Sequence, residues 1–448
     1  MADLTVKGAT IVTPAGTRRA DIAARDGSIF AVQPDLDRVG TVVDGSGLLV
    51  LPGMVDTHVH LMDPGPTERE DFPTGTAAAA ARGVTTIIEH THAHPIREPA
   101  DLTDKLRYLQ DRSHVDFGLA AHVWPDRIDR LEALWAGGIT FFKIFTCTTH
   151  GVPGIGSSGL LEALRSVAGF GGVCLIHCED ELITAEAEKA LRESGRNDNG
   201  VVIEWRNREA EEAAIAVAAT LVRMTGAAAT IAHVSTPEAA RLIAEARAAG
   251  ADISAEACPQ YFALREDEIL EEGPLRKFTP PARIRSDEEG RAMLDLLGDG
   301  TFSHVASDHA PSTREQKLAG DIWEAPFGLP GLDSTFPWLL DAALSGAFPL
   351  EKVAELYSEA PARRYGLFPG KGRLGAGADA DFVLVDPSSE FELSDATVIS
   401  KAGWTPYAGR RFRGRVVATY LRGREIARDG SPHDGRAGTF APGPGWSR

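Results

Sequence analysis

Short apolar runs alternate with helical segments along most of the chain. The runs are rich in β-branched and aromatic residues, and the segments between them are rich in Ala and charged residues. Such an alternation is typical of a parallel sheet whose strands are joined by crossover helices. Eight strands are predicted, at residues 49–60, 84–90, 116–123, 140–145, 173–179, 229–235, 252–259 and 304–310. This pattern predicts an α/β fold built on a closed, TIM-like (β/α)8 barrel.

The segment after Ser235 shows how a helix between two of these strands is delimited. Thr236 can cap the amino end, and Pro237 suits the first turn. Gly250 can end the helix. We therefore expect a helix between the strands at 229–235 and 252–259.

Both ends of the chain follow a different pattern. Residues 1–50 and 370–435 contain short alternating strands separated by turn signals. Since neither piece is long enough to form a stable domain by itself, we expect them to pair into one small β-sandwich domain. That composite domain flanks a barrel spanning residues 51–369, and the Pro/Gly-rich tail at 436–448 is expected to be irregular.

Composition narrows the classes of protein. The chain has 43% hydrophobic and 25% charged residues, and it has no apolar run long enough to span a bilayer. Its start lacks the features of a secretory signal, and its four cysteines show no paired spacing, so we expect a soluble cytoplasmic protein with reduced thiols. The formal net charge of -18 argues against a nucleic-acid partner.

Two histidines end the first predicted strand. His58 and His60 are two residues apart, so alternation places both imidazoles on one face, where they can bind one ion at the mouth of a barrel. The carboxyl ends of barrel strands are where such enzymes carry their active sites. Considered alone, however, the two histidines could equally well be a coincidence or part of the packed core.

Lys143 lies inside the apolar run FFKIF at the end of the fourth strand. Burial of an unpaired ammonium is costly and lowers a lysine pKa. A neutral amine can add carbon dioxide to form a carbamate whose two oxygens can bridge two cations. The alternative is an ordinary strand-end lysine paired with a carboxylate, and the nearby histidines favour the carbamate.

Three further metal-binding groups follow predicted strands. His177 and His233 each end an apolar run and can supply neutral nitrogen donors to a second ion, although either alone could be a core histidine. Asp308 closes the eighth strand, where a carboxylate can bind an ion and also take a proton. It is improbable that all six groups lie at strand ends by chance.

At this point the sequence resembles the cyclic amidohydrolases of the amidohydrolase superfamily, which include hydantoinases, dihydropyrimidinases, allantoinases and dihydroorotases. The resemblance covers nearly the whole chain and rests on LPGMVDTHVHLMDPG, FKIF, LIHCE, IAHVS, EACPQY, TPPAR, SDHAP, APARRYGL and KGRLGAGADADFVLVDP. It implies that one ion is bound by His58, His60 and Asp308 and the other by His177 and His233. N6-carboxylated Lys143 would bridge them.

The resemblance also implies a reaction. Two divalent ions, zinc above all but with manganese or cobalt as alternatives, would activate a bridging hydroxide that attacks a cyclic amide or ureide carbonyl. Asp308 would act as general base and then protonate the leaving ring nitrogen. No organic cofactor is required, the substrate is a small ring, and the family's habit implies a homodimer or homotetramer.

Four residues are candidates for binding the substrate, because they lie where relatives carry substrate-binding groups. Met62 occupies the position where dihydroorotases carry a carboxylate-binding arginine, and His92 lies near their second-strand asparagine. Thr148 stands approximately where many D-hydantoinases and dihydropyrimidinases have a tyrosine, while Thr279 is expected to use backbone groups. These features favour an allantoinase-like or hydantoinase-like enzyme, with dihydroorotase as the alternative.

Other polar residues stay open at this point. His90, His92 and His94 could form a third metal site or a substrate patch, or simply be solvated loop histidines. The role of His150 is equally open, and Arg283 could grip a carboxylate or pin its own loop.

Two other classes compete with the ring-opening hydrolase. A non-catalytic scaffold on this barrel would lack metal ligands, and a mononuclear deaminase would not need Lys143. Metal content separates the three classes. A scaffold would bind no ion, a mononuclear deaminase one ion per chain, and the ring-opening hydrolase two.

Overall fold

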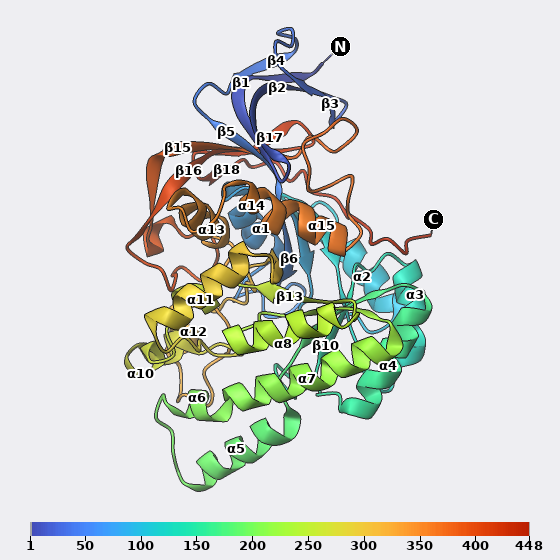
Figure 1. Cartoon of the computed structure of the whole chain (residues 1–448), viewed down its shortest axis with the longest axis vertical. Helices are drawn as coiled ribbons and strands as arrows, with labels where there is room; N and C mark the ends of the chain where they lie inside the picture. The colour runs from blue at the N-terminus through green and yellow to red at the C-terminus, as the bar shows by residue number, and fades with distance from the viewer. Residues whose placement is uncertain (1, 448) are drawn as a thin grey trace.

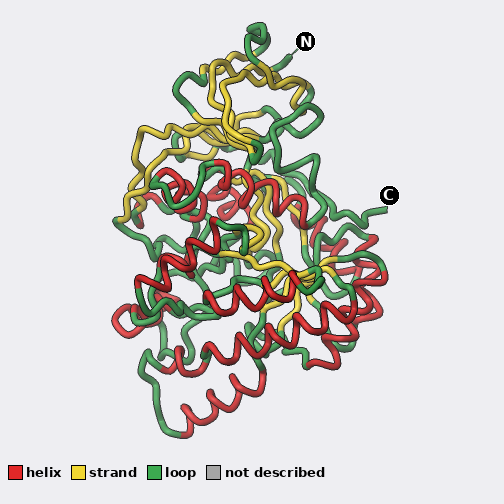
Figure 2. The backbone as a smooth tube through the Cα atoms, in the orientation of Figure 1, coloured by secondary structure: helices red, strands yellow, loops and turns green. Residues whose placement is uncertain are grey.

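Parallel strands in the middle of the chain form a barrel surrounded by helices, and a large sheet lies beyond one end of it (Figures 1 and 2). The structure is a computed structural model that describes residues 2–447. The barrel strands are β6 (Met54–Val59), β7 (Val84–Glu89), β8 (Asp116–Leu119), β9 (Ala121–His122), β10 (Phe142–Phe145), β11 (Val173–His177), β12 (Ala228–Ile231), β13 (Ile253–Ala257) and β14 (Phe302–Val305).

These strands occupy eight positions in the barrel. β8 pairs with β7 and β9 pairs with β10, both in parallel, so the two together make the third position, interrupted at Ala120. The first and eighth positions meet where the His60 amide donates to the His309 carbonyl at 2.8 Å. A parallel bridge joins Val59 and His309 at the same place. The predicted closed barrel is confirmed.

The predicted single strand at 49–60 is wrong, because it consists of two strands that change partners at Gly53. β5 (Leu49–Pro52) pairs with the flanking sheet, whereas β6 pairs with β7 in the barrel. A side-chain carbon at Gly53 would lie 2.2 Å from Thr85 Oγ1, so glycine permits the close approach. Hydrophobic periodicity continues through such a change of partner and does not reveal it.

Helices surround the barrel (Figure 2). The predicted helix after Ser235 is confirmed as α8 (Pro237–Ala248), whose amino end is capped by the Thr236 side chain. The other helices are α1 (Phe72–Ala81), α2 (Pro99–Leu109), α3 (Leu131–Ala136), α4 (Ser157–Gly169), α5 (Glu181–Glu193), α6 (Val201–Trp205), α7 (Arg208–Thr225), α9 (Gln260–Ala263), α10 (Glu268–Glu272), α11 (Asp287–Gly298), α12 (Arg314–Leu318), α13 (Thr335–Leu344), α14 (Glu351–Ala354) and α15 (Ala360–Arg364). Short 3-10 turns lie at Ile128–Arg130, Gly273–Arg276 and Asp395–Thr397, and a π-helical turn at Glu355–Glu359.

The two ends of the chain share the flanking sheet, as predicted. β5 from the amino-terminal part pairs antiparallel with β15 from the carboxyl-terminal part. Hydrogen bonds run continuously through the order β18-β17-β16-β15-β5-β1-β2-β3, with β4 beside β1. The strands not yet given bounds are β1 (Leu4–Thr13), β2 (Gly16–Arg25), β3 (Ser28–Gln33), β4 (Thr41–Asp44), β15 (Phe382–Leu393), β16 (Arg410–Leu421), β17 (Arg424–Arg428) and β18 (Ser431–Pro432).

A buried ionic cluster ties this sheet to the barrel. The Lys371 ammonium lies 2.5 Å from Asp116 in β8, 2.7 Å from Asp381 at the start of β15 and 2.8 Å from Asp379. Arg422 also contacts Asp116. Residues far apart in the sequence are therefore held together by opposite charges in a region with little water.

The carboxyl-terminal tail runs along β8. The Phe117 amide donates to the Thr439 carbonyl at 3.0 Å, and the Ala441 amide donates to the Phe117 carbonyl at 2.8 Å. Beyond this bridge, the described part of the tail contains neither helix nor strand. It covers the edge of β8 that β7 leaves free.

Two whole-chain expectations can be compared with the structure. Among residues 2–447, the helices are too short or too polar to cross a membrane. The four cysteines are buried and unpaired. This agrees with the expected reduced thiols.

Candidate active site

The six residues predicted to bind metal all line one small cavity at the carboxyl ends of the barrel strands. They come from five strands or the residues directly after them: β6, β10, β11, β12 and β14. The cavity is lined by His58, His60, His92, Lys143, Phe145, His150, His177, His233, Thr279, Asp308, Ala310 and Gly328.

Four of the six groups form one contact set. Asp308 Oδ1 lies 3.3 Å from His58 Nε2 and 3.5 Å from His60 Nε2. Lys143 Nζ lies 3.3 Å from His58 Nε2. Asp308 has a φ of 48°, which is uncommon for a residue with a side chain and often marks a functional site. The backbone therefore turns this carboxylate toward both imidazoles.

His177 and His233 form the second contact set. Their Nδ1 and Nε2 atoms, respectively, lie 3.0 Å apart. His177 Nε2 is bound by Glu179 Oε2 at 2.8 Å, so its Nδ1 is the atom that faces His233. Two imidazole nitrogens thus converge on one point of the cavity.

The imidazoles of the first set are oriented from behind. Glu256 Oε1 lies 2.7 Å from His58 Nδ1, and the His90 carbonyl lies 2.8 Å from His60 Nδ1. Each acceptor holds the Nδ1 proton, which leaves the Nε2 lone pair facing the cavity. Burial raises the pKa of Glu256, but His58 and His304 outweigh it and hold that pKa well below its usual range. Glu256 therefore remains an anion.

Glu179 has the same role behind His177. It accepts from the Thr279 hydroxyl at 2.7 Å and from Arg206 at 3.2 Å. Burial raises the pKa of Glu179, yet the charge of Arg206, the hydrogen bond with His177 and the charge of Arg283 keep it well below its usual range. This buried carboxylate stays ionised and fixes the ring of His177.

Arg283 belongs to this supporting network and does not line the cavity. It donates to Glu211 at 2.5 Å, to Glu179 at 3.3 Å and to the Arg206 carbonyl at 2.7 Å. Because its guanidinium is used up by these partners, the structure supports the loop-pinning alternative.

Lys143 is 1% exposed and lines the same cavity as His177 and His233 of the second contact set. Burial lowers the pKa of Lys143 to about 8, although Glu256 and Asp308 partly oppose this shift. A lysine in this condition carries an accessible neutral amine near neutral pH. That is the form that can add carbon dioxide.

The histidines are also in the state that metals require. Burial lowers the pKa of His58 and His177, and it lowers that of His233 well below its usual range. Within the described residues, His233 Nδ1 is buried without a hydrogen-bond partner. Neutral imidazoles with carboxylate oxygens form a donor set suited to divalent transition ions, so these residues fit such a metal pair.

Sequence reasoning missed two supporting residues and left the role of a third, His90, undecided. Glu179 and Glu256 were missed, although each is a carboxylate in or directly after an apolar strand and could have been noticed for that reason. The His90 ring lies within reach of an ion shared with His58 and His60. Both His90 ring nitrogens are buried and have no hydrogen-bond partner in the described chain.

The candidate substrate-side residues divide into three groups. His92 and Thr279 line the cavity itself. Met62 lines an adjoining outer cleft. Thr148 is exposed and its hydroxyl donates to Glu181 at 2.9 Å, so the structure does not bring it to the cavity. Proximity in sequence to Lys143 placed Thr148 near the site, but the loop turns it toward α5.

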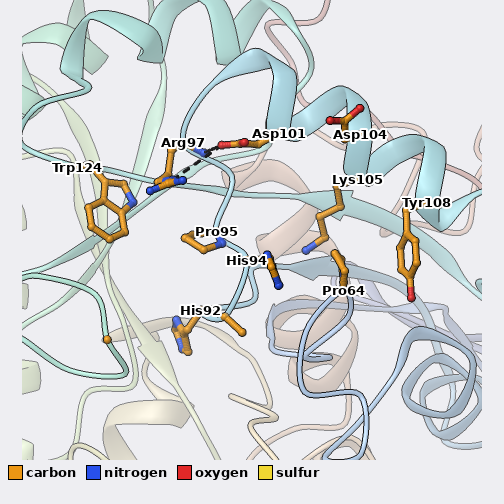
Figure 3. A pocket seen from close by; sticks show the side chains of 12 residues that line it. Pro64, His92, His94, Pro95, Arg97, Asp101, Asp104, Lys105, Tyr108 and Trp124 are labelled. Atoms are coloured by element: carbon orange, nitrogen blue, oxygen red, sulfur yellow. Dashed lines mark hydrogen bonds and ion pairs between the residues drawn. The ribbon is translucent and has the colours of Figure 1, made fainter.

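His92 stands where three hollows meet. Its ring stacks on His150 with centroids 4.6 Å apart, and its Nδ1 lies 3.3 Å from His122 Nε2. The first hollow is the cavity itself. Figure 3 shows another, a cleft of about 500 Å³ whose lining includes His92, the exposed His94 and the buried Lys105. His92 therefore lines both the cavity and the clefts on either side of it.

Known protein sequences resemble this chain over nearly its whole length. The model described as Amidohydrolase family matches residues 49–426. An allantoinase from Rubrobacter xylanophilus is 38% identical over 98% of this chain and 97% of its own length. An allantoinase from Bacillus velezensis is 34% identical, covering 98% of this chain and 97% of its own.

Solved structures give the same picture. L-Hydantoinase (dihydropyrimidinase) from Arthrobacter aurescens has a TM-score of 0.93 and 29% identity, covering 99% of this chain and 100% of that one. Dihydropyrimidinase from Brevibacillus agri NCHU1002 has a TM-score of 0.92 and 27% identity, covering 99% of each chain.

Proposed function

Because this chain belongs to the amidohydrolase family, we propose that it hydrolyses a cyclic amide or ureide ring, as the names of the allantoinases and hydantoinases it resembles suggest. The observation that carries the proposal is the convergence of six metal-binding groups in one cavity. The reaction class is hydrolysis of a carbon–nitrogen bond within the ring.

The proposal includes two divalent cations. His58, His60 and Asp308 would hold one, and His177 and His233 the other, with Lys143 as a carbamate between them. Zinc suits this mixture of imidazole and carboxylate donors, and manganese or cobalt could replace it. When bound, the ions would supply Lewis acidity toward the ring carbonyl and make water a stronger nucleophile.

Asp308 is the residue placed to move the proton. Its carboxylate is 13% exposed and lies beside the imidazoles of both His58 and His60. It would accept a proton as a water oxygen bonds to the ring carbonyl carbon, and would return that proton to the ring nitrogen as the carbon–nitrogen bond breaks. The products are an acid and a freed amide or amine on one open chain.

The preferred ring is a five-membered ureide of the allantoin or hydantoin type. The allantoinase relatives and the hydantoinase structures support this choice over dihydroorotate, and Met62 leaves no cation at the position noted above. No organic cofactor is proposed. We also propose a cytoplasmic homodimer or homotetramer, on the resemblance alone.

A substrate panel tests the proposal. Zinc- or manganese-loaded protein would be offered allantoin, a 5-substituted hydantoin, dihydrouracil, dihydroorotate and a simple cyclic imide. Turnover of a ring by the wild type, its loss in Lys143→Ala and its retention in Lys189→Ala are expected. Lys189 is an exposed lysine on α5 and serves as the matched control.

Metal content separates the competing classes. Two ions per chain are expected from the ring-opening enzyme, one from a mononuclear deaminase and none from a scaffold. Two ions with every ring intact would contradict the proposed substrate class. A chain that binds no metal would contradict the proposed function as a whole.

A further inference from the structure

Within the described residues, one arginine of the cleft beside the cavity has no ion pair, and the only charge that acts favourably on it is that of Glu68, the residue before it. Arg69 lies in the loop between β6 and α1, and its Nε donates to the Pro311 carbonyl at 3.1 Å. Pro311 is three residues beyond Asp308. This bond ties the guanidinium to the segment that carries the proposed proton-transfer residue.

Arg69 differs from the other arginines near the site. Arg206 and Arg283 are paired with Glu179 at 3.2 and 3.3 Å. In the neighbouring cleft, Arg97 is paired with Asp101 (Figure 3). Within residues 2–447, the terminal nitrogens of Arg69 have no hydrogen-bond or ion-pair partner. A half-buried cation without an ion pair is costly, so an anionic ligand at these terminal nitrogens would stabilise it.

The cleft beside Arg69 opens onto the cavity. It has a volume of about 380 Å³ and shares His92, His150 and Ala310 with the cavity. Met62 and Phe327 give it an apolar side. A substituent of a ring held at the cavity can therefore extend into this cleft.

The other charged groups of the cleft leave Arg69 as the available donor. Lys277 Nζ already donates to the Ile322 carbonyl at 2.6 Å and to the Trp323 carbonyl at 3.1 Å. Glu324 also lines the cleft, but it is exposed and does not pair with Arg69. Arg69 presents two parallel N–H donors, the geometry that matches a carboxylate.

We propose that Arg69 binds a carboxylate on the substituent of the substrate ring, so that among the five-membered ureides proposed above the protein prefers those with an acidic substituent. This inference rests on the proposed ring-opening function and adds the class of substituent. Arg69 would act on binding of the ring and its orientation, and it would not take part in bond breaking.

Matched pairs of rings test the preference. We would compare hydantoin-5-acetate with hydantoin-5-acetamide, and dihydroorotate with its carboxamide, because each pair differs only in the charge of the substituent. The wild type is expected to favour the acid in kcat/KM by roughly tenfold to hundredfold, mostly through KM. Arg69→Gln should abolish this ratio, and Arg69→Lys should restore part of it.

Arg97→Gln is the control, because it removes an arginine from the neighbouring cleft and should leave the acid-to-amide ratio unchanged. A merely structural role for Arg69 would lower turnover of acid and amide alike. An equal ratio in wild type and Arg69→Gln would therefore overturn the proposal.

A binding measurement keeps the test independent of turnover. N-Carbamoylaspartate is the open-chain counterpart of these acidic rings, and its binding to metal-loaded protein can be followed by calorimetry. Binding weakened roughly tenfold or more in Arg69→Gln would support the subsite even if no ring is hydrolysed, and only the proposed function would then fail. Equal binding to both proteins would overturn the subsite.

Discussion

At the scale of single residues, three of the four imidazoles of the candidate centre are each held by a group behind the ring. Glu256 supports His58, the His90 carbonyl supports His60, and Glu179 supports His177. These partners select the ring nitrogen that faces the cavity. An imidazole binds metal only when its free ring nitrogen faces the ion. The supporting residues should therefore strongly affect metal affinity, although they do not contact the metal.

Glu256→Gln tests this at one residue. The amide keeps the shape of the side chain but loses the charge that holds the His58 proton. We expect metal affinity to fall roughly tenfold to hundredfold, measured by competition with a chelator. Glu266→Gln, which changes an acidic residue in the loop before α10, should bind metal like the wild type. Unchanged affinity in Glu256→Gln would show that His58 needs no carboxylate behind it.

At the scale of elements, a buried charge cluster joins the flanking sheet to the barrel. Lys371 has three carboxylates around it, on β8 and at the start of β15. Although burial lowers it, the pKa of Lys371 lies well above its usual value because of Asp381, Asp116 and Asp379. A raised pKa in the folded state means that the ammonium stabilises the fold below its unfolded value of about 10.5, as long as its carboxylate partners are ionised, and that this contribution declines above it.

Lys371→Met should therefore expose the cost of leaving these carboxylates unpaired. At pH 7 we expect the free energy of unfolding to fall by about 3–5 kcal/mol, measured from denaturant midpoints. The difference from wild type should shrink in acid, where the carboxylates take up protons. Lys352→Met, which breaks a surface pair with Glu355, should change stability by less than about 1 kcal/mol. Equal midpoints for Lys371→Met and wild type at pH 7 would contradict this account.

At the scale of the whole molecule, the centre gathers groups from strands distributed around the barrel. Ions shared by β6, β10, β11, β12 and β14 would bind only the closed barrel, because the unfolded chain does not bring these residues together. Binding to the folded state alone stabilises it by mass action. The proposed ions should therefore act as structural links as well as reagents.

Removing metal should lower the apparent melting temperature. A free concentration of one thousand times Kd contributes about 4 kcal/mol per ion, so a decrease of roughly 5 °C or more is expected after chelation. Adding zinc back should restore the original value. If calorimetry gives the same temperature for chelated and reloaded protein, with metal analysis confirming both states, the link between binding and folding is absent.

Sequence alone was sufficient for the parts that depend on local pattern. Alternating apolar runs and helices predicted the eight-strand barrel, and the cap at Thr236 predicted the start of α8. The positions of His58, His60, Lys143, His177, His233 and Asp308 at the carboxyl ends of predicted strands also placed these residues at one end of that barrel. These features follow from periodicity and steric rules that act over a few neighbouring residues.

Only the tertiary structure decided which side chains meet. It split the predicted strand 49–60 at Gly53, took Thr148 away from the cavity, and placed Glu179, Glu256 and Arg69 beside it. Local pattern could have marked Glu179 and Glu256 as carboxylates at strand ends, but it could not have shown the other outcomes, because those depend on contacts between segments distant in the sequence. A side chain's neighbours across a barrel are set by strand register and loop path, and neither is written in the periodicity of one segment.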